Sequence, residues 1–114
     1  MDEWQDEAAC RALAPSRPSD PDLFFDFDEE ASGDGVAWEA RLTCLGCPVR
    51  EPCLASAFLT DHSLRFGVWG GTLPVNRLAL RAHPDRLTLL RNQVDNYGKR
   101  MASIHEILRR GVVA

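Results

Sequence analysis

The sequence predicts a small all-α protein, a bundle of short helices followed by a C-terminal helical extension. Three observations support this prediction. Prolines and glycines divide the first 80 residues into short segments, several with apolar residues at helical spacing. Residues 87–108 repeat apolar residues every three or four positions, which is the period of an amphipathic helix. No segment shows the alternation of apolar and polar residues that indicates a half-buried strand.

Length and composition indicate one small folded unit. A chain of 114 residues buries only roughly 60–70% of its unfolded surface, so a covalent or metal tie would add useful stability. No apolar run is long enough to cross a membrane. The acidic start over residues 2–7 lacks the basic and apolar regions of a secretory signal, so we expect a cytoplasmic protein. In the cytoplasm four cysteines favour metal ligation or redox chemistry over structural disulfides.

The expected elements follow in order along the chain. Residues 2–13 can form a short helix before a proline-rich stretch, and residues 31–35 have the composition of a loop. Trp38 and Leu42 share one face of a helix over 36–44, and Pro52 opens another helix that runs to about Thr60. Residues 67–71 form a glycine-rich tight turn, and residues 74–82 form a short helix. Trp38 and Phe58 are expected in the core.

The C-terminal segment has the clearest period. Its apolar stripe lies on a helix that opens after Pro84, and it comprises Leu87, Leu90, Val94, Tyr97, Met101, Ile104 and Leu108. Gly98 interrupts this helix at a cost of about 1 kcal/mol relative to alanine. The favoured interpretation is packing of the stripe on the rest of the domain. The alternative is self-association or a partner helix, because the spacing is that of a coiled-coil seam.

Charge is divided between the two parts of the chain. Residues 1–47 hold 12 acids and 3 arginines, a net charge of −9, whereas residues 48–114 have a net charge of +5. The basic part indicates contact with a polyanion such as the DNA backbone, and the alternative is a solvated helix face. The candidate phosphate-contacting residues are Arg77, Arg81, Arg86, Arg91, Lys99, Arg100, Arg109 and Arg110.

The four cysteines have a spacing that indicates a shared site. Cys10 is distant, and Cys44, Cys47 and Cys53 form a C-x2-C-x5-C pattern with turn residues in the spacer. Cys53 falls in the first turn of the helix expected after Pro52, where free N–H groups favour a thiolate. Four thiolates fit either tetrahedral zinc or a cubane iron–sulfur cluster, and ligand identity alone does not separate these. A C-x2-C redox dithiol is a further alternative.

Together these motifs resemble the WhiB-like family of actinobacteria and their phages. The resemblance covers residues 1–72 and rests on Trp4 before Cys10, on the segment 21–25, on the cysteine spacing and on the Gly67–Gly71 turn. It implies an all-α transcriptional regulator, not an enzyme, organised around an oxygen- and nitric-oxide-sensitive [4Fe–4S] cluster. It implies that Cys10, Cys44, Cys47 and Cys53 hold the cluster iron.

The resemblance also implies a partner, the C-terminal domain of the primary sigma factor in the RNA polymerase holoenzyme. The family positions used at that contact correspond here to Trp4, Phe24, Phe25, Gly67, Val68, Trp69, Gly70 and Gly71. Residues 73–114 depart from the family pattern and are expected to form a basic helical extension, with possible DNA contact. Two other functions stay open: a thiol–disulfide oxidoreductase acting in the apo form, and a structural zinc-binding interaction module.

Overall fold

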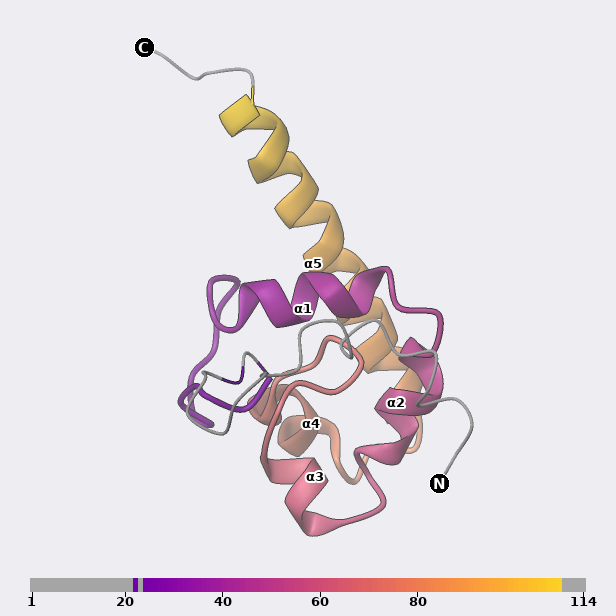
Figure 1. Ribbon diagram of the computed structural model, residues 1–114. Coiled ribbons are helices and arrows are strands. Elements are labelled where there is room, and N and C mark those ends of the chain that lie inside the picture. Colours follow the sequence, from indigo (N-terminus) through magenta and orange to yellow (C-terminus); the bar gives the residue numbers. More distant parts are fainter. Residues whose placement is uncertain (1–21, 23, 110–114) are drawn as a thin grey trace.

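The computed structural model describes residues 22 and 24–109, and five helices make up most of this part of the chain (Figure 1). They are α1 (Trp38–Leu45), α2 (Arg50–Ser56), α3 (Asp61–Arg65), α4 (Pro74–Leu80) and α5 (Arg86–Arg109). A single bridge joins Trp69 and Thr72, and the described residues contain no strand. The all-α prediction is therefore confirmed. The helix expected over residues 2–13 lies outside the described residues.

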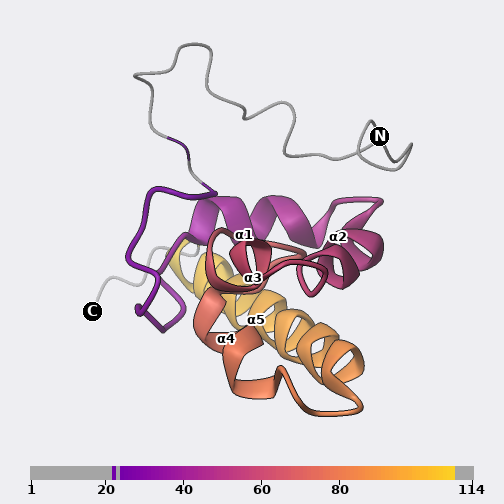
Figure 2. The same cartoon turned by 90° about the horizontal axis from the view of Figure 1, so that it is seen from below.

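Helix α5 is the element around which the others are arranged. It contacts α1, α2 and α4, while α3 packs on α4. Figure 2 shows α5 lying across one side of α1 and α2, with α4 beside it. Residues 73–109 therefore pack against the same core as the preceding helices, and a domain boundary at residue 72 stays a prediction.

Local chemistry explains where the short helices begin. Pro74 opens α4, and the side-chain oxygen of Asn76 accepts a hydrogen bond from the Leu73 amide at 2.9 Å. Helix α3 was not predicted from the sequence. It begins after Thr60, whose Oγ1 accepts from the Ser63 amide at 3.0 Å, so a side-chain cap supports a helix too short to show a period. Helix α2 begins two residues before Pro52, which lies in its first turn.

The buried core combines residues from the start of the described chain with residues of α5. Phe24, Ala40, Cys44, Val68 and Leu73 form one buried cluster. Leu90, Val94 and Tyr97 from the stripe of α5 are also buried. Gly98 allows the close approach of α1, because a Cβ at this position would lie 3.1 Å from a methyl group of Leu45. Gly98 therefore lowers the intrinsic stability of α5 but allows α1 to pack closely against it.

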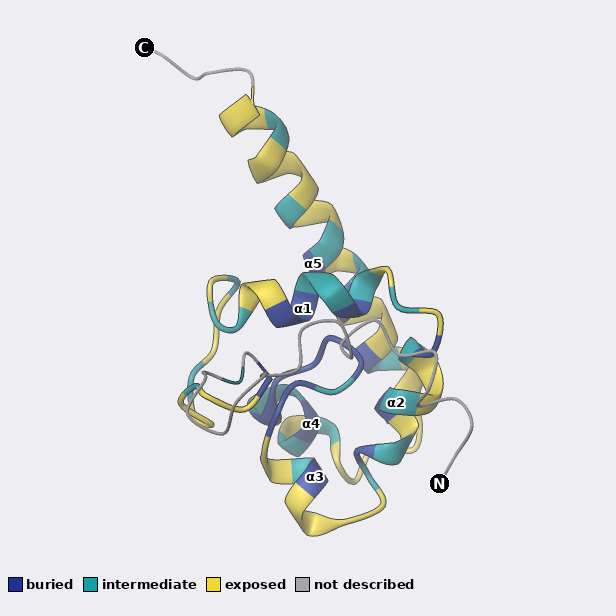
Figure 3. Cartoon of the chain, in the orientation of Figure 1, coloured by how far each residue is buried: buried dark blue, intermediate teal, exposed yellow. Residues whose placement is uncertain are grey.

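The stripe of α5 divides into two halves with different surroundings. Leu90, Val94 and Tyr97 in its first half pack on the domain, as the favoured interpretation predicted, whereas Leu87 at its start is 41% exposed. Its second half extends past the other helices, and Ile104 and Leu108 are 46% and 71% exposed (Figure 3). The expectation of a core position for Trp38 is wrong, since this side chain is 48% exposed near the same half of α5, whereas Phe58 is half-buried. Among the described helices none has the length and apolar character needed to cross a bilayer.

Arg77 on α4 is fully buried and organises the chain around it. Its Nε donates to the Leu64 carbonyl at 3.1 Å, and its Nη2 donates to the Phe66 and Gly67 carbonyls at 3.2 and 2.8 Å. Its Nη1 donates to both oxygens of Thr72, at 2.8 and 3.1 Å. Burial lowers the pKa of Arg77 to about 10, so the guanidinium is still charged at neutral pH.

The placement of Arg77 corrects its assignment as a phosphate contact. A side chain with no exposed surface and five internal hydrogen bonds is not available to DNA in this fold. Its sequence neighbourhood gave no sign of this, because a helical arginine in a basic segment normally faces solvent.

Replacement of Arg77 should be strongly destabilising. We expect Arg77→Met to lower the free energy of unfolding by about 3 to 5 kcal/mol, because several buried carbonyls lose their donor together. Arg81→Met, at an exposed position at the end of the same helix, should change it by less than about 0.5 kcal/mol. Urea denaturation followed by circular dichroism measures both, and equal effects would contradict the structural role of Arg77.

Candidate metal centre and its aromatic surface

Three cysteines from two neighbouring helices line one narrow cavity. Cys44 is in the last turn of α1, Cys47 follows in the connecting turn, and Cys53 is in α2. The Cys47 amide donates to the Cys44 carbonyl at 3.1 Å, which closes the turn between them. The cavity, of about 30 Å³, is otherwise walled largely by apolar groups that include Phe24, Val49 and Val68.

The donor set fits a thiolate-bound iron or zinc group. Cys44 is buried, and Cys47 and Cys53 are half-buried, so their sulfurs would be shielded from bulk water. Soft thiolates in apolar surroundings are the ligands that iron–sulfur clusters and structural zinc ions use. Within the described residues, no three His, Cys, Asp or Glu side chains are grouped as ligands of one metal ion. Cys10, the fourth predicted ligand, lies outside the described residues.

The glycine-rich turn Gly67–Gly71 packs directly against this cavity. Gly67, Gly70 and Gly71 have positive φ, as the sequence predicted. A Cβ on Gly70 would lie 2.7 Å from the Cβ of Leu54 and 2.9 Å from the Arg50 carbonyl oxygen. A Cβ on Gly71 would lie 3.6 Å from the Cβ of Cys44. Glycine is therefore required here both for the backbone conformation and for the close approach to the cysteine-bearing helices.

Two buried arginines lie near the cysteines. Burial lowers the pKa of Arg77, and the negative charge of a thiolate at Cys53 partly opposes this shift. Burial also lowers the pKa of Arg41, while charges on Tyr97, Asp34 and Cys44 oppose that shift. Both cations favour ionised sulfur, which is the form that binds metal. Sequence reasoning missed Arg41 and this role of Arg77, because their burial depends on long-range packing.

Three partly exposed aromatic side chains border the same turn. Phe25 lies against Gly67, Phe66 precedes it in the chain, and the indole Nε1 of Trp69 donates to the Phe66 carbonyl at 2.8 Å. We call these three residues the aromatic surface. Phe25 and Phe66 are exposed and Trp69 is half-buried. Phe66 was not singled out from the sequence, although its position directly before the glycine turn is the signal that could have found it.

The other residues assigned to a partner contact have different surroundings. Phe24 and Val68 are buried in the core, and the Val68 amide donates to the Phe24 carbonyl at 2.8 Å. Gly67, Gly70 and Gly71 are buried as well. These five residues support the turn from inside, and their assignment to the partner contact stays a prediction. Trp4 lies outside the described residues.

The candidate phosphate contacts have different surroundings. Arg91 and Arg100 are exposed but pair with Glu51 and Asp34, which joins α5 to the body of the domain. Arg109 pairs with Glu106 on its own helix. Arg86 is half-buried and lies over the Phe58 ring, 5.2 Å from its centroid. Arg81 and Lys99 are exposed, and Arg110 lies outside the described residues.

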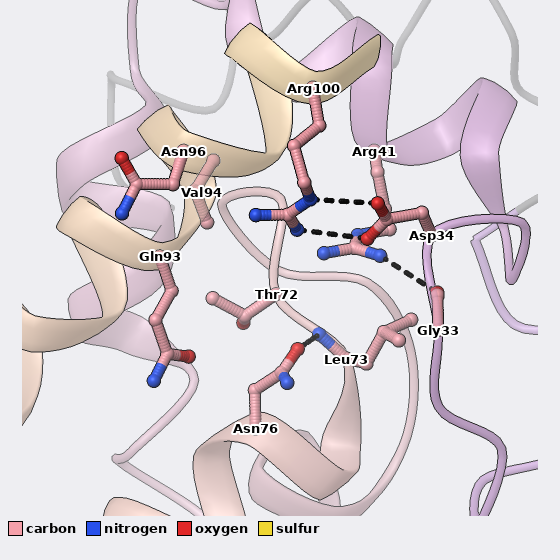
Figure 4. Close-up of a pocket in the computed structure, with 10 residues that line it drawn as sticks. All are labelled: Gly33, Asp34, Arg41, Thr72, Leu73, Asn76, Gln93, Val94, Asn96 and Arg100. Atoms are coloured by element: carbon pink, nitrogen blue, oxygen red, sulfur yellow. Dashed lines mark hydrogen bonds and ion pairs between the residues drawn. The ribbon is translucent and has the colours of Figure 1, made fainter. Parts of the chain in front are cut away.

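A second pocket is polar and lies between α1, α4 and α5 (Figure 4). It measures about 320 Å³. Arg100 donates to both carboxylate oxygens of Asp34 at 2.7 and 2.8 Å, and Arg41 donates to the Gly33 and Gly71 carbonyls at 3.3 and 3.1 Å. The Arg41 guanidinium also lies 3.7 Å above the centroid of the Tyr97 ring. These contacts fasten α5 to the loop before α1 and to the glycine turn.

Comparison with known proteins identifies the family. The family model described as "Transcription factor WhiB" matches residues 4–80. This chain belongs to the WhiB family of transcription factors. It is 38% identical over 80 residues to the transcriptional regulator WhiB2 of Mycobacterium tuberculosis, covering 70% of this chain and 75% of that protein. It is 36% identical over 78 residues to WhiB of Streptomyces coelicolor, covering 68% of this chain and 75% of that protein.

The family model and the similar relatives match only part of this chain. WhiB4 of Mycobacterium marinum is 35% identical over 83 residues, 72% of this chain and 60% of that protein. The matched range 4–80 includes all four cysteines, the glycine turn and Arg77. It ends with α4, so α5 lies beyond it, although the first half of α5 completes the core of the matched region.

Gly70 offers a direct test of the packing between the turn and the cysteine-bearing helices. We expect Gly70→Ala to lower the free energy of unfolding by about 2 to 4 kcal/mol, because it combines left-handed strain with a clash against Leu54 and Arg50. Gly46→Ala is the matched control, since Gly46 has a φ of −93° and open space around its Cβ position. Thermal denaturation measures both, and an unchanged stability of Gly70→Ala would refute the packing.

Proposed function

We propose that this WhiB-family transcription factor holds a [4Fe–4S] cluster on Cys10, Cys44, Cys47 and Cys53, and that it contacts the C-terminal domain of the primary sigma factor. The observation that carries the proposal is the placement of three of these cysteines around one apolar-walled cavity directly behind the glycine turn. When bound, the cluster supplies a redox group that responds to oxygen and nitric oxide.

The chain's own residues connect the cysteine site to a surface. Cys44 and Cys53 belong to α1 and α2, and ligation by both would fix these helices relative to each other. Gly70 packs against α2 and Gly71 lies against α1, so a movement of one helix relative to the other would displace the turn. Arg77 holds the other side of the turn through the carbonyls of Phe66, Gly67 and Thr72. Trp69 would therefore change its position when ligation is lost.

The aromatic surface has the chemistry of a protein contact. Aromatic side chains supply most of the binding energy at many protein interfaces, and neighbouring charges steer the encounter. Phe25 lies in a segment, residues 22–39, that carries seven acids and no basic residue. Such a surface suits a basic helix-turn-helix domain. Contact with DNA phosphates, by Arg81 and Lys99 foremost, would add a sequence-independent and salt-sensitive term.

A structural zinc site is the second candidate, and one observation favours it. The cavity of about 30 Å³ is closer in size to a single ion than to a four-iron cluster. Zinc would tie the same elements together but would supply no redox response.

Replacement of one ligand tests the cysteine assignment. We expect Cys47→Ala, purified anaerobically, to lose the broad visible absorption and the iron, compared with about four irons per wild-type chain. Thr43→Ala is the matched control, because Thr43 lines the same cavity without a sulfur ligand. One zinc and no iron in the wild type would select the second candidate, and a full cluster in Cys47→Ala would refute the assignment.

Replacement of Trp69 tests the sigma contact separately from the metal. We expect Trp69→Ala to retain its metal but to weaken binding to the isolated sigma C-terminal domain by at least tenfold, because hot-spot aromatics contribute about 2 kcal/mol or more. Leu59→Ala is the control, since Leu59 is 79% exposed and belongs neither to the aromatic surface nor to the cysteine site. Titration calorimetry measures both, and equal affinities would contradict the assigned role of Trp69.

A further inference from the structure

An apolar groove of about 640 Å³ lies between α1 and the outer half of α5, away from the cysteine cavity. Trp38 and Leu42 form one wall, and Met101, Ile104 and Leu108 form the other. The outer half of α5 stands clear of the body of the domain on its remaining sides (Figure 3). None of these residues takes part in the cysteine site or in the aromatic surface.

Three large exposed apolar side chains line this groove. Trp38 is 48% exposed, and Ile104 and Leu108 are 46% and 71% exposed. Ile107 is exposed on the same half of α5. Single exposed apolar residues are ordinary, but contiguous patches of large apolar side chains on a protein surface mark interaction sites.

The groove is a continuation of the core. Leu90, Val94 and Tyr97 pack against the domain, and Met101, Ile104 and Leu108 follow them at the same spacing of three and four residues. The stripe therefore lies on one face of α5 along its whole length, and the domain buries only its middle part, Leu90, Val94 and Tyr97. A second helix lying along the outer half would complete it.

The charges of the two segments that form the groove indicate which partner supplies that second helix. The segment 22–39, which includes Trp38, carries seven acids and no basic residue. The outer half of α5, residues 99–109, carries Lys99, Arg100 and Arg109 against one acid, Glu106. Within the chain Arg100 pairs with Asp34 of the acidic segment and Arg109 pairs with Glu106, so the excess charges are Lys99 on one side and six acids on the other. The two walls of the groove thus come from segments of opposite charge. Under a twofold axis, the basic helix end of one copy would meet the acidic segment of the other, twice over.

We propose that this groove is a homodimer interface, in which the outer halves of two α5 helices cross antiparallel. Ile104 and Leu108 of each copy fill the groove beside Trp38 and Leu42 of the other copy, and Arg109 approaches the acidic segment. Only a few side chains of each copy take part, so we expect the dimer to dissociate at roughly micromolar concentration. The occupant is a second copy and not a different protein, because both halves of the complementary pattern are present in this chain.

Sedimentation equilibrium of the full chain tests this proposal. The chain is purified anaerobically with reductant, so that disulfide cross-links do not contribute, and is measured over about 1 to 500 µM because a small interface dissociates in this range. We expect the mean mass to rise from one chain to two. A single-chain mass at every concentration would overturn the proposal, including the case in which another segment of the same chain fills the groove.

Glutamate substitutions locate the interface. We expect Ile104→Glu and Leu108→Glu each to weaken the dimer at least tenfold, because each would bury a charge in an apolar contact. Leu59→Glu is the matched control, since Leu59 is 79% exposed and does not line the groove. All three positions are exposed in the single chain, and circular dichroism confirms that the variants fold. Dimerisation of the groove variants at wild-type strength would overturn the proposal.

A charge reversal tests the complementarity. We expect Arg109→Glu to weaken the dimer severalfold at low salt, whereas Arg65→Glu leaves it unchanged. The two arginines are closely matched, because each is exposed and pairs with an acid three or four residues earlier on its own helix. Both changes alter the net charge equally, so a non-specific charge effect would weaken both. Equal effects of the two variants would overturn the proposed arrangement.

Discussion

The buried guanidinium of Arg77 is the contact on which the cysteine-side architecture depends. It donates hydrogen bonds to the Leu64 carbonyl at the end of α3, to the Phe66 and Gly67 carbonyls, and to Thr72. Apart from Leu64, none of these acceptor residues belongs to a regular helix or strand. A turn with three glycines at positive φ has little conformational preference of its own. The Arg77 guanidinium has a planar set of N–H donors, so it can bind several buried carbonyls at once. In a β-sheet, backbone N–H groups would be the partners of such carbonyls.

This arrangement makes the turn a connection between two regions. On one side it contacts Leu54 and Cys44, and on the other it carries Trp69 and lies against Phe25. Helix α5 packs against the same turn and against α1. Its Val94 lies against Gly71, and its Tyr97 ring stacks under the Arg41 guanidinium. The region that matches the WhiB family therefore uses a helix outside the match to complete its core. Family members with a different C-terminal segment need another way to cover this face.

Local patterns in the sequence were sufficient to predict most of the fold. Pro74, Pro84 and the stripe of α5 marked two helices, and the glycine spacing at 67–71 predicted positive φ, because these signals act within a few residues. Helix α3 was missed because a five-residue helix with a threonine cap has no period to detect. The interior of the turn could not be predicted either. The burial of Arg77, the supporting position of Phe24 and the exposure of Trp38 depend on contacts between distant segments, which neither composition nor spacing encodes.

The glycine turn physically joins the cysteine site to the aromatic surface. Amide hydrogen exchange over residues 66–72 tests this connection, in the chain purified anaerobically with the proposed metal group and again after treatment with a chelator. We expect faster exchange of the Val68 and Thr72 amides, which donate to Phe24 and Trp69, once the proposed ligation no longer fixes α1 and α2. Faster exchange confined to residues 44–53, with the turn unchanged, would contradict it.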